Sequence, residues 1–88
     1  MNVDFSILVS IFLDRALTVP AVDATLQVDA RMPQHRHGMN VRPQISEDEP
    51  GKYRVEGLRC HMPGHWELYF DITRDGLTER ASCFLEFD

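Results

Sequence analysis

Apolar and polar residues alternate along most of this 88-residue chain, and that period of two constrains its fold more than any other feature. Residues 3–13 carry apolar side chains at every odd position, and residues 24–32 carry them at every even position. Side chains two apart lie on one face of a strand, so both segments predict strands with one buried face. Two further alternations, over 65–73 and 77–87, flank an Asp-Gly pair at 75–76 that is typical of a hairpin turn.

The segments between these alternations predict connections and shorter strands. Charges and a proline in residues 14–22 indicate a connection, and residues 33–51 predict a long loop rich in His, Pro, Gly and acids. Within that loop we expect a short edge strand near 41–45 and an acidic, solvated turn at 47–51. Residues 52–58 predict another strand.

The strand pattern predicts the fold class. No stretch keeps a helical period over three turns, and a chain this short holds one small core. We therefore predict a single all-β domain over residues 1–88, a small antiparallel β-sandwich of the immunoglobulin-like or cupredoxin-like kind. Gly57 indicates a bulge or a close backbone approach. On the last strand we expect Ala81, Cys83, Leu85 and Phe87 to point inward.

The composition argues against several function classes. Fourteen acidic residues against nine basic ones give a formal charge of −5, which disfavours nucleic acid and an anionic membrane surface as partners. No apolar run is long enough to insert into a membrane. The apolar run over 7–13 lacks a basic region before it, so it predicts a buried strand and no signal peptide. Nucleophile elbows, HExxH and phosphate-binding glycine loops are absent, so we expect no enzyme.

The two cysteines, Cys60 and Cys83, allow either one disulfide or two free thiols. They do not form a CxxC pair, so thioredoxin-type redox chemistry is not indicated. Cys60 stands directly beside His61, which leaves metal ligation by its thiol open. Neighbours on an extended chain point to opposite faces, so the two residues are poorly placed to act as nucleophile and base.

Two loops concentrate side chains that bind soft metal ions. In the first, His35, His37 and Met39 stand at alternate positions, and an extended backbone would direct all three toward one point. The second loop, between two predicted strands, carries the ligand types at three positions, His61, Met62 and His65. All four histidines of the chain lie in these loops.

Mixed imidazole and thioether ligands indicate copper, in preference to zinc, if the two loops lie at the same end of the sandwich. A metal-free interpretation stands beside this one. In it, Met32 is the last core residue of its strand, and Met62 packs under Trp66. His37 or His61 forms hydrogen bonds to loop carbonyls and so holds the turn. The protein would then be an interaction or structural module, and an edge strand near residue 41 would allow a homodimer.

Three segments of the sequence resemble the YtkA-like domain family. They are 28–39, which contains Met-Pro-Gln-His-Arg-His-Gly-Met, then 53–58, and finally 61–68, which begins His-Met-Pro-Gly-His-Trp. The resemblance covers residues 3–87 and implies a small bacterial β-sandwich found in exported or membrane-anchored proteins. Several family members lie near genes for copper handling or respiratory oxidases.

Carried onto this chain, the first motif of the family implies His35, His37 and Met39 as metal ligands, and the second implies His61 and Met62. His65 occupies a variable position of the second motif and joins the candidates as an addition. The resemblance thus implies a periplasmic or exported copper-binding module, with a protein partner in metal delivery or oxidase assembly.

Overall fold

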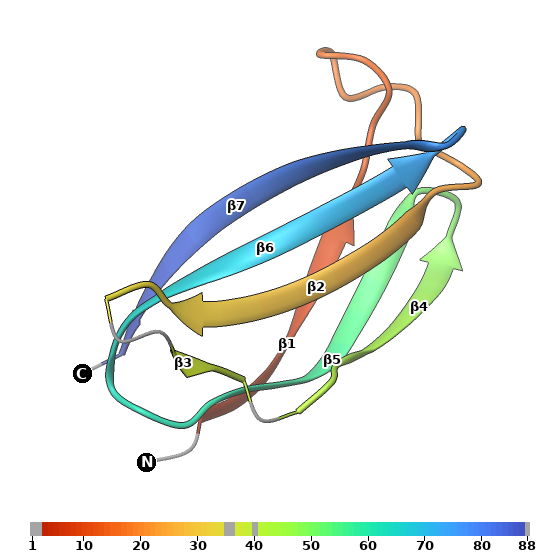
Figure 1. The fold of residues 1–88 in the computed structure, drawn as a ribbon. Helices are drawn as coiled ribbons and strands as arrows, with labels where there is room; N and C mark the ends of the chain where they lie inside the picture. Colours follow the sequence, from red (N-terminus) through yellow and green to blue (C-terminus); the bar gives the residue numbers. More distant parts are fainter. Residues whose placement is uncertain (1–2, 35–36, 40, 88) are drawn as a thin grey trace.

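The computed structural model describes residues 3–34, 37–39 and 41–87, and these residues form strands and connections with no helix. The strands are β1 (Val3–Ser10), β2 (Thr25–Met32), β3 (His37–Gly38), β4 (Gln44–Glu49), β5 (Lys52–Cys60), β6 (Gly64–Arg74) and β7 (Leu77–Phe87). They form two antiparallel sheets, ordered β1-β5-β4 and β3-β2-β6-β7, which pack face to face (Figure 1). The predicted all-β sandwich is confirmed. None of the described segments has the helical length and apolar character needed to cross a membrane.

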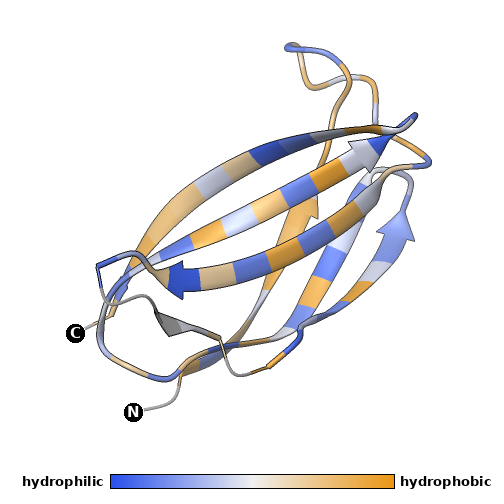
Figure 2. Ribbon diagram, viewed as in Figure 1, coloured by the Kyte–Doolittle hydropathy of each residue, from blue (hydrophilic) through white to orange (hydrophobic). Residues whose placement is uncertain are grey.

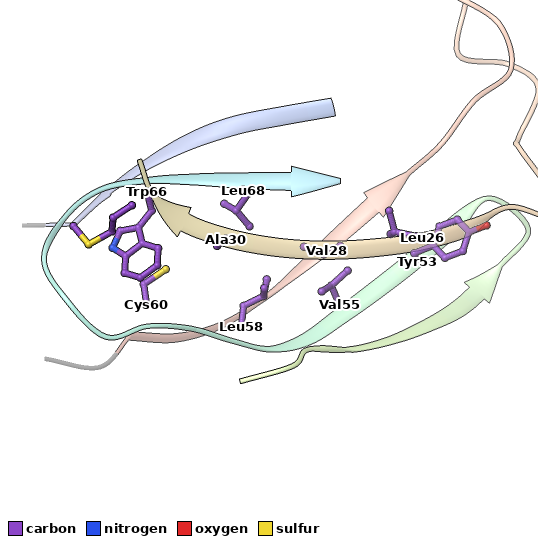
Figure 3. Packing of buried hydrophobic residues seen from close by; sticks show 10 residues of the cluster. Leu26, Val28, Ala30, Tyr53, Val55, Leu58, Cys60, Trp66 and Leu68 are labelled. Atoms are coloured by element: carbon purple, nitrogen blue, oxygen red, sulfur yellow. The ribbon is translucent and has the colours of Figure 1, made fainter. Parts of the chain in front are cut away.

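The core forms between the alternating faces of β2, β5 and β6. On β2 the even residues from Leu26 to Met32 are buried and the odd ones exposed, as the period of two predicts (Figure 2). The inner side chains of the three strands meet in one cluster, in which Leu58, Trp66 and Leu68 are the largest fully buried residues (Figure 3). Apolar burial in this cluster is the main stabilising contribution to the fold.

A β-bulge lies in β5 where the sequence predicted one. Phe5 pairs with Leu58 and Ile7 with Val55, so two residues of β5 oppose one residue of β1 between these pairs. One of the two is Gly57, which has φ of +81°, a value that costs a side-chain-bearing residue considerable strain.

The first strand is shorter than the sequence predicted. β1 ends at Ser10, and Phe12 then forms only an isolated bridge with Pro20. The Asp14 carboxylate accepts hydrogen bonds from the backbone amides of Thr18 and Val19, which turns the chain back on itself. This local turn diverts residues 11–13 from the sheet despite their alternating pattern.

The predicted acidic turn at 47–51 is wrong in its first half. Residues 47–49 belong to β4, which begins at Gln44, and the turn is confined to Pro50 and Gly51. An edge strand tolerates consecutive acids because its side chains stay in water, and Asp48 also forms an ion pair with Arg54 at 2.9 Å. The predicted edge strand near 41–45 therefore lies a few residues later in the chain.

Most of the inner face of β7 is exposed, contrary to the sequence-based prediction. Cys83 pairs with Leu68 of β6, yet Ala81 and Cys83 are both exposed. β1 approaches β7 at one end, where the rings of Phe5 and Phe87 lie 6.1 Å apart. Further along, a groove separates the two strands, so the inward-directed side chains of β7 are not covered.

Candidate metal centre

Strand pairing brings the two candidate loops to the same end of the sandwich. β2 ends at Met32, whose backbone pairs with that of His37 in β3. The second loop connects β5 to β6 and reaches β6 at Gly64. A Cβ atom at Gly64 would lie 2.8 Å from the terminal Cε of Met32, so the two segments touch directly. The two loops therefore lie at the same end of the sandwich (Figure 1).

Trp66 forms the floor of this end. Its side chain is fully buried, and its indole Nε1 donates a hydrogen bond of 2.9 Å to the carbonyl oxygen of Met62. The imidazole of His61 lies edge-on to the indole, with ring centroids 5.6 Å apart. These two contacts hold the 61–63 segment over the indole, so the backbone of the second loop is fixed by the core beneath it.

Met39 and Met62 are partly buried, and both pack against the core cluster that contains Trp66. The backbone amide of Met39 donates to the carbonyl of Ala30 at 3.2 Å, which continues the pairing of β2 beyond β3. A half-buried thioether combines a packed side chain with access from solvent. We name the region formed by Met32, Met39, Met62, His61 and Trp66, with Cys60, the Trp66 end.

Cys60 lies under the Trp66 end as a core residue. It is fully buried beside the indole of Trp66 (Figure 3), and burial raises the pKa of its thiol. A thiol that resists deprotonation is a poor metal ligand and a poor nucleophile, because both roles need the thiolate. Cys60 and Cys83 are both free thiols in the structure, one in the core and the other on the exposed face of β7.

The remaining candidate histidines are placed differently. His65 lies on the face of β6 opposite to Trp66, where it stacks on Phe84 with ring centroids 4.6 Å apart. Its Nδ1 contacts Glu86 Oε1 at 3.1 Å, so its neighbours belong to the outer face of the hairpin. The backbone of His37 lies beside the end of β2, because it pairs with Met32. The predicted ligand His35 lies outside the described residues.

The chemistry of the donor set decides which ions fit. Within the described ranges, no three His, Cys, Asp or Glu side chains converge as a metal-binding group. The soft donors that the two loops offer are the thioethers of Met39 and Met62, which both pack on the core cluster, and the imidazole of His61, which contacts Trp66. Thioether sulfur is a soft ligand that suits Cu(I), whereas zinc sites are built from thiolate, imidazole and carboxylate.

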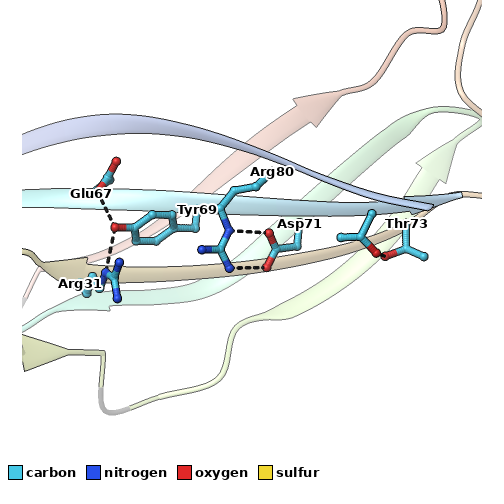
Figure 4. Close-up of polar contacts among 7 residues, drawn as sticks. Arg31, Glu67, Tyr69, Asp71, Thr73 and Arg80 are labelled. Carbon is cyan, nitrogen blue, oxygen red and sulfur yellow. Dashed lines mark hydrogen bonds and ion pairs between the residues drawn. The ribbon is translucent and has the colours of Figure 1, made fainter. Parts of the chain in front are cut away.

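A polar network on the outer face of β2, β6 and β7 was not singled out from the sequence. The Tyr69 ring lies between the guanidinium groups of Arg31 and Arg80, at 4.7 Å and 5.0 Å (Figure 4). The Tyr69 hydroxyl donates to Glu67, and Arg80 binds Asp71 through two hydrogen bonds of 2.7 Å and 3.0 Å. The hydrogen bonds from Arg80 hold the pKa of Asp71 below its ordinary value.

The signal for this network is the set of polar residues that alternate with the core positions on 25–31 and 67–73. It appears only after β2 and β6 are paired, because Asp29 then stands opposite Tyr69. Its opposite charges are paired across the strands, which makes it a stabilising surface of the sheet.

Comparison with known proteins adds no relative. No family model matches the chain, and neither the curated proteins nor the solved structures contain a match. The resemblance to YtkA-like domains therefore stays a prediction from the sequence.

Proposed function

We propose that this protein binds a copper ion at the Trp66 end and passes it on by ligand exchange. The proposed ligands are Met39, Met62 and His61, together with His35 and His37 of the first loop. The observation that supports the proposal is the contact of Met32, the residue before the first loop, with Gly64, the residue with which the second loop enters β6. The ion would be held as Cu(I), since two thioethers and an imidazole match its softness.

A cargo site needs ligands that are pre-positioned yet reachable. The Trp66 hydrogen bond to Met62 and the packing of Met39 on the core supply the positioning. Met39 and Met62 are both partly exposed, so an incoming ligand from a partner protein would have access to an ion bound there. The resemblance to YtkA-like domains adds a periplasmic location and a partner in metal delivery or oxidase assembly to this proposal.

The test is titration of the metal-free protein with Cu(I) against a competing chelator. We expect one copper per chain, with affinity at least about tenfold lower in Met39→Leu, Met62→Leu, His61→Ala and His35→Ala. Leucine conserves the volume of methionine, so the methionine variants remove the sulfur and keep the packing.

Two variants serve as matched controls. His65→Ala removes a histidine on the outer face, and Met32→Leu removes a buried thioether of the same end. Both should bind copper like the wild type. The proposal is wrong if the chelator retains all the copper, or if the four ligand variants bind as tightly as the two controls.

A second candidate function, a metal-free interaction module, is favoured by one observation. An apolar groove lies between β1 and β7, away from the Trp66 end. A partner that binds in this groove would do so whether or not copper is bound at the Trp66 end.

A further inference from the structure

The sandwich has two open sides, and only one of them is protected by charge. The free edge of the three-stranded sheet at β4 exposes Glu47, Asp48 and Glu49, which repel a second acidic strand. On the other side, β1 and β7 are the free edges of their sheets, and the groove between them has a volume of about 560 Å³. We call the region formed by this groove and its rim the open side.

Two exposed large hydrophobic side chains, Leu8 of β1 and Leu17 of the connection between β1 and β2, line the groove of the open side. The walls of the groove are also apolar, with Ile7 and Val9 on β1 facing Phe70 and Ala81. Figure 2 shows the contrast between the orange β1 and the blue end of β4. An exposed apolar patch of this kind marks an interaction surface.

The occupant is identified by the charges on β7. When a strand pairs antiparallel with its own copy, residues equally far from the twofold axis face each other. An axis at Cys83 places Arg80 opposite the partner's Glu86 and Ala81 opposite the partner's Leu85. Two symmetric ion pairs and two apolar pairs result. An axis at Ser82 would instead place Arg80 opposite the partner's Phe84 and form no ion pair.

Arg80 has enough N–H donors to bind Asp71 of its own chain and Glu86 of the partner at the same time. Its bonds to Asp71 use Nε and Nη2, and a guanidinium group carries five N–H donors in all. β7 contains no proline and no glycine, so nothing in its sequence interrupts backbone pairing with a second strand.

We propose that two copies of this protein pair antiparallel through their β7 edges, with the twofold axis at Cys83. The β1 edge of each copy then faces that of its partner, so the two grooves cover each other's apolar walls. This proposal stands on a different surface from the copper site and does not depend on it.

Charge reversal tests the proposed register. Sedimentation equilibrium of the wild type should show a monomer–dimer equilibrium. Arg80→Glu and Glu86→Arg should each raise the dimer dissociation constant at least about tenfold, because each places like charges opposite one another twice. The double variant Arg80→Glu/Glu86→Arg should recover the wild-type constant. Asp71→Asn breaks the same intramolecular ion pair as Arg80→Glu and should leave the dimer intact.

Thiol cross-linking tests the axis in the unmutated chain, so the proposal stays falsifiable if a charge variant fails to fold. A short bismaleimide should link two chains through Cys83, and Cys83→Ser should abolish the link, since Cys60 is buried. A wild type that stays monomeric at millimolar concentration overturns the proposal. So does a dimer that both charge reversals leave unchanged, a double variant that fails to recover, or the absence of a Cys83 cross-link.

Discussion

Cys60 and Cys83 lie in the two regions of the molecule that differ most in burial. Cys60 belongs to the Trp66 end, where side chains from β2, β5 and β6 close over one another. Cys83 belongs to the open side, where β7 extends beyond the cover of β1. Both residues stand at inward positions of their strands, yet one is fully buried and the other is exposed.

The difference shows that an inward position becomes a core position only where another strand faces it. At the Trp66 end side chains from β2, β5 and β6 close over one another, and a hydrogen bond from Trp66 to Met62 fixes the second loop on this core. At the open side no such cover is present among the described residues, so the apolar side chains there stay available to a partner. Our two proposals follow this difference, with a copper ion at the first region and a second copy of the chain at the second.

The largest expected difference between the buried and the open region is in the free energy of unfolding, and two leucines, one from each region, measure it. Leu58 is fully buried, whereas Leu8 on the open side is 73% exposed. Leu58→Ala should lower the free energy of unfolding by about 2–5 kcal/mol, through lost burial and the cavity left behind. Leu8→Ala should change it by less than about 0.5 kcal/mol. Urea unfolding of the two variants in dilute solution measures both values, and equal losses would contradict the assignment of buried and open regions.

The two cysteines give a smaller contrast. Cys60→Ser should cost about 1–3 kcal/mol, because it leaves a hydroxyl group in an apolar site, and Cys83→Ser should be close to neutral. Burial raises the pKa of Cys60, so its thiol should also resist modification in the folded protein.

A chromogenic disulfide reagent should therefore modify one thiol per chain in dilute native protein and two in denaturant. The native reaction should vanish in Cys83→Ser and persist in Cys60→Ser. Rapid modification of both thiols in the native state would show that the Trp66 end is not closed.

The smallest expected effect is electrostatic and concerns the outer face of β6 and β7. The hydrogen bonds from Arg80 lower the pKa of Asp71, so the ionised form is favoured by folding. The stabilisation is present above the unfolded pKa of about 3.9 and is lost as the pH falls below that value. The urea midpoint should drop between pH 7 and pH 3, and it should drop less in Asp71→Asn. Identical pH profiles for the two proteins would show that ionised Asp71 does not contribute to stability.

Much of the fold could be predicted from the period of two. The inward residues of β2, such as Leu26, Val28 and Ala30, are buried as expected, and the β6–β7 hairpin follows from Asp75 and Gly76. β4 was misplaced because a solvated edge strand carries no alternation of apolar residues. The exposure of Cys83 was missed because a strand pattern tells which residues share a face, and not what covers that face.

The candidate site could be predicted only in part. The ligand types and their two loops are visible in the sequence, because His and Met residues gather there. The contact of Met32 with Gly64 depends on how β2 pairs with β6, which no local pattern contains. The same strand geometry explains why His65 faces outward, one position before the inward-facing Trp66.

Trp66 is the only tryptophan of the chain, and it forms the floor of the proposed copper site. The most direct test is therefore a Cu(I) titration of the metal-free protein followed by the fluorescence of Trp66. We expect a fluorescence change that saturates at one copper per chain, is weakened in Met62→Leu and is unaltered in His65→Ala. Fluorescence that stays constant through an excess of copper, or that drifts without saturation, would contradict a copper site at the Trp66 end.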